Sequence, residues 1–144
     1  MKTKKRFTWI FLSLFMFVLP LSAIAKDVSP IVSTEWLSKY LSNPKVVVLD
    51  IRKAEEYRAG HIPNAVNVFY GSWAIGKDGL RNQLPATDDL FDIIGSAGID
   101  TDSIVVVVDK VDTMTDRVGI SRVAWTLRYA GLENVTMLDG GYNK

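Results

Sequence analysis

The sequence predicts an α/β protein in which helices cover both faces of a central, mainly parallel and doubly wound sheet. Two segments, 46–51 and 104–108, are short apolar runs with almost no alternation of polar and apolar side chains. Such runs are typical of strands that are buried on both faces of a sheet. Strand-like and helix-like segments also alternate along the chain, which favours a three-layer arrangement of helices, sheet and helices.

The first 25 residues have the pattern of a secretory signal peptide. Four basic residues precede the apolar run 9–19, and Ala23-Ile24-Ala25 offers small residues at the spacing that a signal peptidase recognises. We predict cleavage before Lys26 and a periplasmic or secreted product with no membrane contact. An N-terminal membrane anchor is the alternative, because the segment 7–25 carries no charge. Its strongly apolar core is only about 11 residues long, however, and a membrane span needs about 20.

The remaining residues, 26–144, are expected to form one domain. Removing the leader takes Lys+Arg from 17 to 13 against 16 Asp+Glu, a net charge of −3. No basic patch with interleaved aromatic residues remains, so nucleic-acid binding is not predicted. The chain has no cysteine and only one histidine, His61. Thiolate catalysis is therefore excluded, and neither a cofactor nor a metal site is predicted.

The first half of this domain contains the first buried strand. Ser33 is a suitable N-cap for the helix before that strand, and Gly60 ends the short helical segment after it. Several Gly and Pro residues then favour a long surface loop. In order, we expect a lead-in (26–32), a helix (34–41), the strand (46–51), a helical turn (52–60), a turn (61–65), a short strand (66–69) and the surface loop (70–85).

The second half is organised around the strand 104–108, which is predicted to be central in the sheet. Thr87 is expected to cap the preceding helix, and Gly131 to end the following one. In order, we expect a helix (88–97), the central strand (104–108), a polar loop (109–117), a helix (118–130), a strand (135–138) and a turn (139–141).

The polar loop after the central strand is the strongest candidate for a functional site. α/β proteins commonly bind ligands where a strand delivers a loop to the N-terminus of a helix. The backbone N–H groups of such a loop can cradle an anion. The charged side chains of this loop are the candidate site residues: Asp109, Lys110, Asp112, Asp116 and Arg117.

Four segments resemble, in order, the rhodanese (thiosulfate sulfurtransferase) family: 48–52, 56–65, 104–108 with its loop and helix, and 134–142. The segment 125–135 is similar, more narrowly, to the non-catalytic N-terminal domain of two-domain rhodaneses. The resemblance implies a rhodanese-like three-layer domain over 26–144. It also implies a cysteine after the central strand, whose thiolate takes a sulfur atom from thiosulfate and passes it to an acceptor.

This sequence departs from the family pattern at the nucleophile, where Asp109 stands in place of the cysteine. A carboxylate cannot carry a persulfide, and the acidic loop would repel thiosulfate. The sequence also stops at Tyr142-Asn143-Lys144, where the family continues through a tryptophan and a terminal segment. We therefore expect an exported domain that is not catalytic alone and that is a structural or regulatory half for a catalytic rhodanese domain, in the same or another chain.

Two other functions remain open. The first is a periplasmic small-anion binding or interaction module that uses the loop amides and Arg117. The second is a metal-dependent hydrolase with Asp109 as nucleophile and Asp112 and Asp116 as further ligands. We prefer an Asp109 that only accepts hydrogen bonds from loop amides, because the loop has no glycine and Lys110 would lie near any metal ion.

Three further polar residues have both a structural and a catalytic interpretation. Asp50 and Arg52 could be an acid and an anion clamp, or an ion pair that braces the following turn. His61 could be a general base, or a turn histidine that is hydrogen-bonded to the backbone. We favour the structural interpretation of each, because structural ion pairs are common and no Ser or Cys partner for His61 is evident.

Overall fold

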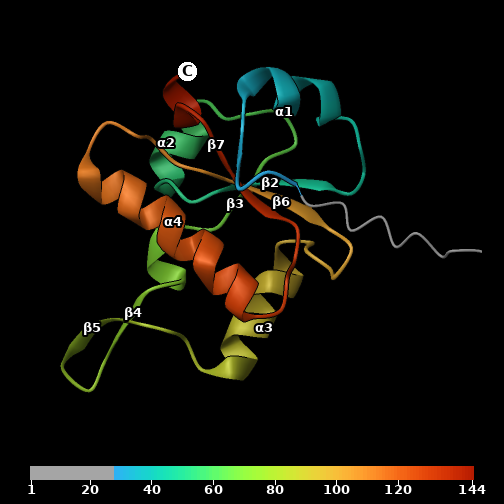
Figure 1. The fold of residues 1–144 in the computed structure, drawn as a ribbon. Coiled ribbons are helices and arrows are strands. Elements are labelled where there is room, and N and C mark those ends of the chain that lie inside the picture. Colours follow the sequence, from blue (N-terminus) through green and yellow to red (C-terminus); the bar gives the residue numbers. More distant parts are fainter. Residues whose placement is uncertain (1–27) are drawn as a thin grey trace, which may run out of the picture.

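A five-stranded sheet forms the centre of the structure, a computed structural model that describes residues 28–144 (Figure 1). The strand order is β1-β7-β6-β2-β3, and every neighbouring pair is parallel. The strands are β1 (Ile31–Val32), β2 (Val46–Asp50), β3 (Val66–Asn67), β6 (Ile104–Val108) and β7 (Val135–Leu138). The predicted α/β fold with a mainly parallel sheet is thus confirmed, whereas the predicted signal peptide lies outside the described residues.

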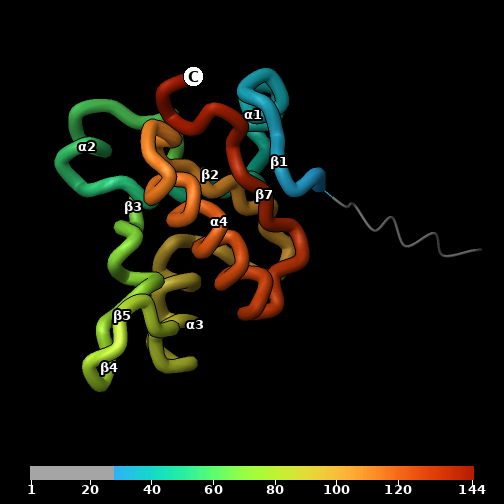
Figure 2. The backbone as a smooth tube through the Cα atoms, turned by 60° about the vertical axis from the view of Figure 1, so that its left-hand side comes forward, coloured from blue at the N-terminus to red at the C-terminus, as the bar shows by residue number. Residues whose placement is uncertain are grey.

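Helices cover both faces of the sheet, as Figures 1 and 2 show. They are α1 (Thr34–Tyr40), α2 (Ala54–Ala59), α3 (Thr87–Ser96) and α4 (Met114–Tyr129). Helices α3 and α4 pack on the face that contains Leu49, Val105 and Val107. Helix α1 packs on the other face against Val48 and Val106, and α2 adds Tyr57 at the edge of that second cluster. Alternate residues of the two central strands therefore serve two separate apolar clusters.

The position of β6 in the sheet explains its composition. All five of its residues are buried, because it lies between β7 and β2 and is covered on both faces. β-Branched side chains suit such a strand, since it offers no solvent-facing position. The loop that follows β6 consequently leaves the middle of the sheet at its carboxyl edge.

The prediction of a long surface loop over 70–85 is wrong, because this segment contains regular secondary structure. It contains the 3-10 helix η1 (Tyr70–Ser72) and an antiparallel hairpin of β4 (Ile75–Lys77) and β5 (Leu80–Gln83). Asp78 and Gly79 form the two-residue turn with φ angles of 52° and 76°. Two consecutive positive φ values are typical of a type I′ turn, for which Asp-Gly is a favoured sequence. Trp73 anchors the segment, since its side chain is fully buried and its Nε1 donates to the Val68 carbonyl at 3.2 Å.

The helix predicted at 118–130 begins one turn earlier, at Met114. Thr113 is its N-cap, and Thr113 Oγ1 accepts a hydrogen bond from the Asp116 amide at 3.2 Å. Asp116 Oδ2 in turn accepts one from the Thr113 amide at 2.9 Å. This reciprocal pair is a capping box, which stabilises the first turn of a helix. The connecting loop therefore spans only 109–113, and Asp116 and Arg117 belong to α4.

Smaller differences concern other element boundaries. The segment 26–32, expected to be a lead-in, contains the edge strand β1, which pairs with β7 through Ile31 and Met137. Helix α3 has Ala86 rather than Thr87 at its N-cap position. The chain ends in a 3-10 helix, η2 (Gly141–Asn143). Within residues 28–144, no helix is both long and apolar enough to cross a membrane.

Candidate functional site

A cleft of about 360 Å³ lies at the carboxyl ends of β2 and β6, where α/β folds usually bind ligands. Side chains from α2, η1, the hairpin and α4 complete its walls. Its charged lining residues are Arg52, Lys53, Glu56, Asp109, Lys110 and Asp116. Its remaining lining residues are Ile51, Phe69, Tyr70, Asn82, Thr115, Val118 and Gly119.

Asp109 follows the last residue of β6 and lines this cleft. Its Oδ1 accepts a hydrogen bond from the Lys110 amide at 2.7 Å, and the side chain is half-buried. Burial raises the pKa of Asp109 to about 6, although the hydrogen bond from Lys110 acts in the opposite direction. The nearby carboxylates of Asp116 and Asp50 also raise this pKa. The residue at the head of the loop is thus a carboxyl group that begins to take up a proton just below neutral pH.

Lys110 brings a positive charge to the cleft, but this charge is already paired. Its Nζ lies 2.5 Å from Oε1 of Glu56 on α2, and both side chains are about one-third exposed. The hydrogen bond from Lys110 lowers the pKa of the Glu56 carboxyl, and the same bond raises the pKa of Lys110. Lys110 is therefore engaged by Glu56 rather than directed at a ligand.

Asp50 and Arg52 form a buried ion pair beneath the cleft. Arg52 Nη2 lies 2.6 Å from Asp50 Oδ2, and the exposed fractions of the two side chains are 3% and 1%. Arg52 Nε also contacts Asp50 Oδ1 at 3.0 Å, so the pair is bidentate. Nη2 additionally donates to the carbonyl of Gly60 at 2.9 Å, at the end of α2. In this geometry the pair links the end of β2 to the end of α2.

The other loop candidates do not gather around Asp109. Asp116 reaches the cleft, but both its backbone and its side chain serve the capping box. Arg117 lies on the opposite side of α4, where its Nε donates to the Val111 carbonyl at 3.1 Å and where it lines a separate groove. Asp112 accepts a hydrogen bond from Asn143 Nδ2 at 2.7 Å. Within 28–144, no three His, Asp or Glu side chains are grouped closely enough to hold a metal ion.

His61 lies outside the cleft. Its Nδ1 is 2.9 Å from the Tyr57 carbonyl oxygen, and its ring stacks on the Tyr57 ring with 3.9 Å between the ring centres. The Tyr57 hydroxyl donates to the Ala65 carbonyl at 2.5 Å. These contacts connect α2 with the turn that leads to β3.

The uncharged half of the cleft is formed by residues that the sequence pattern did not indicate as part of a site. Phe69, Tyr70 and Asn82 line it, and all three come from the segment that was predicted to be a surface loop or lie next to it. Tyr70 also packs against Gly119 of α4, where an added Cβ would lie 3.5 Å from Tyr70 Cδ2. The Asp78-Gly79 dipeptide was a readable signal for the hairpin, but nothing in the sequence indicated that the hairpin folds back towards α4.

Comparisons with known proteins agree with this architecture. A family model described as the rhodanese-like domain matches residues 33–144. A putative thiosulfate sulfurtransferase from Synechococcus elongatus is 30% identical over 125 residues, which cover 85% of this chain and 38% of that protein. A 3-mercaptopyruvate sulfurtransferase from Escherichia coli is 27% identical over 120 residues, covering 76% of this chain and 41% of that protein. The chain thus spans about two-fifths of the length of these curated relatives.

Solved structures show the same fold. The crystal structure of SseA from Escherichia coli, a 3-mercaptopyruvate sulfotransferase with the rhodanese fold, has a TM-score of 0.63 and 22% identity. The matched region is 79% of this chain and 42% of the SseA chain. A human single-domain sulfurtransferase has a TM-score of 0.52 and 17% identity. The matched region is 81% of this chain and 94% of the human chain. Sequence and fold therefore agree that the chain belongs to the family of rhodanese-like domains, whose relatives here include named sulfurtransferases.

Proposed function

We propose that this chain is an exported rhodanese-like domain that transfers no sulfur by itself and that is a structural or regulatory half for a catalytic rhodanese domain. The catalytic domain would belong to the same polypeptide or to a separate chain. One observation carries the proposal: a half-buried carboxyl group, that of Asp109, follows β6 at the place where the family resemblance implies a cysteine, and the sequence contains no cysteine.

The chemistry of sulfur transfer supports this proposal. The reaction needs a thiolate that attacks a sulfur atom and then holds it as a persulfide. The oxygens of Asp109 cannot form that intermediate, and no cysteine elsewhere in the chain could replace it. The cleft is also poorly suited to an anionic sulfur donor, because Glu56 pairs with Lys110 and Asp50 pairs with Arg52.

The range of relatives supports a role other than catalysis. A TBC domain-containing protein kinase-like protein from Gallus gallus is 34% identical over 103 residues, which cover 72% of this chain and 10% of that protein. Similarity to this domain is thus not limited to proteins that are named sulfurtransferases. The export part of the proposal depends on the leader-like pattern of residues 1–25.

A cyanide-dependent assay of thiocyanate formation tests the lack of activity. We expect no turnover above a heat-denatured control with thiosulfate or 3-mercaptopyruvate as the donor. An active rhodanese assayed in parallel is the positive control. Turnover by the purified chain would contradict the proposal.

Two further measurements test export and partnership. The intact mass of the exported protein should correspond to residues 26–144, and retention of residues 1–25 would contradict cleavage. Sequencing the DNA downstream of the Lys144 codon, and then the whole genome, should reveal a cysteine-containing rhodanese domain. A genome without such a domain would contradict the partner role.

Neither alternative function has specific support in the geometry. A small-anion module that uses Arg117 would need this side chain near the loop amides of the cleft, but Arg117 lines the other groove. A hydrolase based on Asp109 would need further metal ligands, yet Asp112 faces Asn143 and Asp116 is held by its capping box. Calorimetric titration with thiosulfate, sulfite and divalent metal ions distinguishes these alternatives from the proposed function.

A further inference from the structure

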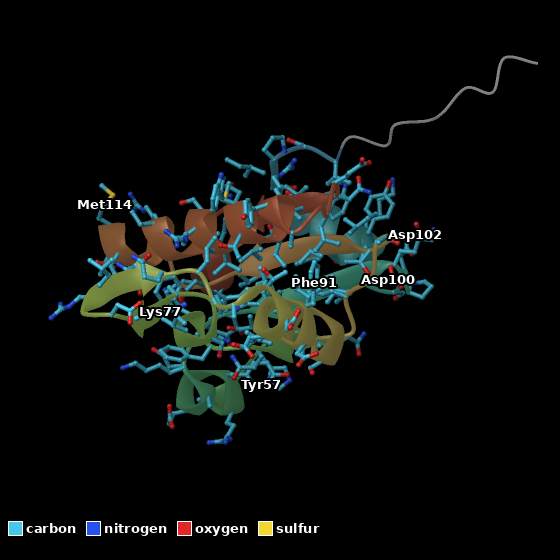
Figure 3. The ribbon with its side chains drawn as sticks, turned by 90° about the horizontal axis from the view of Figure 1, so that it is seen from below. Tyr57, Lys77, Phe91, Asp100, Asp102 and Met114 are labelled. Atoms are coloured by element: carbon cyan, nitrogen blue, oxygen red, sulfur yellow. The ribbon has the colours of Figure 1, made fainter. Side chains whose placement is uncertain are left out.

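Exposed apolar side chains gather on one side of the described domain. Scattered exposed apolar residues are ordinary, but a group of them on one face commonly marks an interaction surface. Six of the eight large apolar side chains that are exposed in residues 28–144 belong to α3, α4 or the hairpin: Leu80, Phe91, Met114, Val118, Trp125 and Tyr129. We call the surface formed by α3, α4 and this hairpin the α3/α4 face; Figure 3 shows Met114 on α4, Phe91 on α3 and Lys77 on the hairpin.

Four of these residues lie along one side of α4, as one pair near each end of the helix. Met114, Val118, Trp125 and Tyr129 recur at helical spacing, opposite the buried residues of the same helix. The rings of Trp125 and Tyr129 stack, with 5.4 Å between their centres. Met114 is 73% exposed and projects from the N-terminal end of α4 in Figure 3. The stripe therefore has two parts, Met114 with Val118 and Trp125 with Tyr129, and more than half of each of these residues is exposed.

Two arginines flank this stripe, Arg122 and Arg128. Each is held by a backbone carbonyl oxygen: Arg122 Nη2 by Asn82 at 2.8 Å and Arg128 Nη2 by Val135 at 2.7 Å. The carbonyl oxygens orient the guanidinium groups without neutralising their charge. The outer surface of α4 is consequently apolar along its centre and positively charged along both sides.

The neighbouring helix α3 has the opposite charge. Asp88, Asp89 and Asp92 are all exposed, and the helix contains no Lys or Arg. Phe91 is 53% exposed and lines a small hollow together with Ala130, just after α4, so it lies on the side of α3 towards α4. Figure 1 shows α3 below the sheet, close to the C-terminal end of α4. An acidic helix with an exposed aromatic ring thus lies beside a basic helix with an aromatic stripe.

We propose that the α3/α4 face binds the same face of a second copy of this chain, in a two-fold symmetric dimer. A two-fold axis between the helices places α4 of each copy on α3 of the other, so both contacts join arginines to aspartates around an apolar centre. This is an isologous, self-complementary interface. The two helices carry outer charges of opposite sign, from Arg122 and Arg128 on α4 and three aspartates on α3, which favours a second copy over a uniformly anionic partner such as a lipid surface.

The size of the face predicts a weak, reversible dimer. At 1.5 Å per residue, the 16 residues of α4 and the 10 residues of α3 extend about 24 Å and 15 Å. With a helix width of about 10 Å, their footprint is about 400 Å², roughly half of what a standard-size interface buries on each partner. We therefore expect a dissociation constant of about 10–100 μM.

Sedimentation equilibrium of the exported chain tests the dimer. The average mass should rise from monomer to dimer as the protein concentration increases from about 1 μM to about 500 μM. A chain that stays monomeric over this range overturns the proposal. So does a monomeric chain that co-sediments with vesicles of phosphatidylglycerol, because the face would then bind lipid.

Two charge-reversed variants give a sharper test. One carries Asp88→Lys and Asp92→Lys, so both helices of its face are basic; the other carries Arg122→Glu and Arg128→Glu, so both are acidic. Each variant alone should bind itself at least tenfold more weakly than the original chain, because like charges meet in both contacts. An equimolar mixture of the two should form heterodimers, because opposite charges then meet in both contacts.

Controls separate the interface from folding. Glu55→Lys on α2, in the opposite layer, changes an exposed charge and should leave the dimer unchanged. Trp125→Gln removes the apolar centre without altering charge and should weaken association at least tenfold, which keeps the test available if a reversed variant fails to fold. Mixed variants that remain monomeric although each melts cooperatively would overturn the proposal. The outcome does not depend on whether the chain transfers sulfur.

Discussion

The ring of Tyr142 lies over the guanidinium group of Arg52, with 3.5 Å between the ring centre and Cζ. The edge of the same guanidinium group is paired with Asp50, and both residues are buried. Tyr142 belongs to η2, so the end of the chain covers an ion pair at the carboxyl end of β2. A cation in this position is held by a carboxylate, a carbonyl oxygen and an aromatic face together.

The buried pair should be far more sensitive to substitution than a surface pair. Arg52→Met keeps the apolar stem but leaves the Asp50 carboxylate buried without its partner, which we expect to lower the free energy of unfolding by about 3–5 kcal/mol. Lys45→Met removes an ion pair with Asp102 whose side chains are 60% and 76% exposed, and should cost less than about 1 kcal/mol. Urea unfolding of both variants measures the difference. Similar losses would mean that Asp50 does not depend on Arg52.

The raised pKa of Asp109 predicts how stability depends on pH. The carboxyl loses its proton near pH 3.8 in the unfolded chain and near pH 6 in the folded one. The folded state therefore binds more protons between these values, and stability falls as the pH rises through this window. Asp109→Asn should remove this loss and raise the free energy of unfolding at pH 7 by about 1–2 kcal/mol. This range is smaller than the full pKa shift implies, because the side chain is partly exposed. At pH 3.5 the substitution should change the free energy of unfolding little.

The measurement for Asp109 is urea unfolding between pH 3.5 and pH 7.5. Asp112→Asn is the matched control, because it is the same substitution at an exposed position of the same loop. Only Asp109→Asn should flatten the pH profile. An unchanged profile would show that burial does not favour the protonated form of Asp109.

The ion pair between Glu56 and Lys110 should weaken anion binding in the cleft. Glu56→Gln removes one negative charge and frees Lys110 Nζ, which now lies 2.5 Å from the carboxylate. We expect thiosulfate to bind the Glu56→Gln variant about tenfold more tightly than the original chain. This is a gain of about 1.4 kcal/mol in binding free energy, as one additional unpaired charge near the ligand would give. Isothermal titration calorimetry at low salt measures it, with Glu55→Gln as the control. Equal affinity in both variants would show that Glu56 does not restrict Lys110.

The parts of the fold that the sequence predicts well are those in which one residue pattern has one structural meaning. An unbroken β-branched run such as 104–108 fits only a strand that is covered on both faces, and the structure has all five residues buried. The segment 70–85 mixes turn residues with the fully buried Trp73. Its local pattern predicts a loop, whereas burial of Trp73 depends on distant residues of α3 and α4 that local reasoning does not include.

The candidate site was harder to predict, because helix phase decides which side chains face each other. Beginning α4 at Met114 instead of Val118 moves Asp116 and Arg117 from the loop to the first helical turn, where successive residues point about 100° apart. Asp116 then reaches the cleft and Arg117 the opposite groove. The Thr113–Asp116 capping box was readable in the sequence and would have corrected the helix start.

Two adjacent glycines provide a final test of how the chain end is positioned against Asp109. Gly140 and Gly141 both have left-handed backbone angles, with φ of 76° and 60°. A Cβ at Gly141 would collide with the carbonyl oxygen of Asp109, which also accepts the Tyr142 amide at 2.9 Å. At Gly140 it would meet only the side chain of Lys144, which is exposed and can move.

Gly140→Ala should therefore show mainly the cost of a left-handed alanine, about 1–2 kcal/mol. Gly141→Ala should lose roughly 3 kcal/mol or more, because it adds a backbone collision to the same conformational cost. Urea unfolding compares the two variants, and near-ultraviolet circular dichroism reports whether Tyr142 leaves its position over Arg52. Equal losses with an unchanged tyrosine signal would mean that the chain end is not held against Asp109. A larger loss for Gly141→Ala would show instead that this close backbone contact fixes η2 over the buried ion pair.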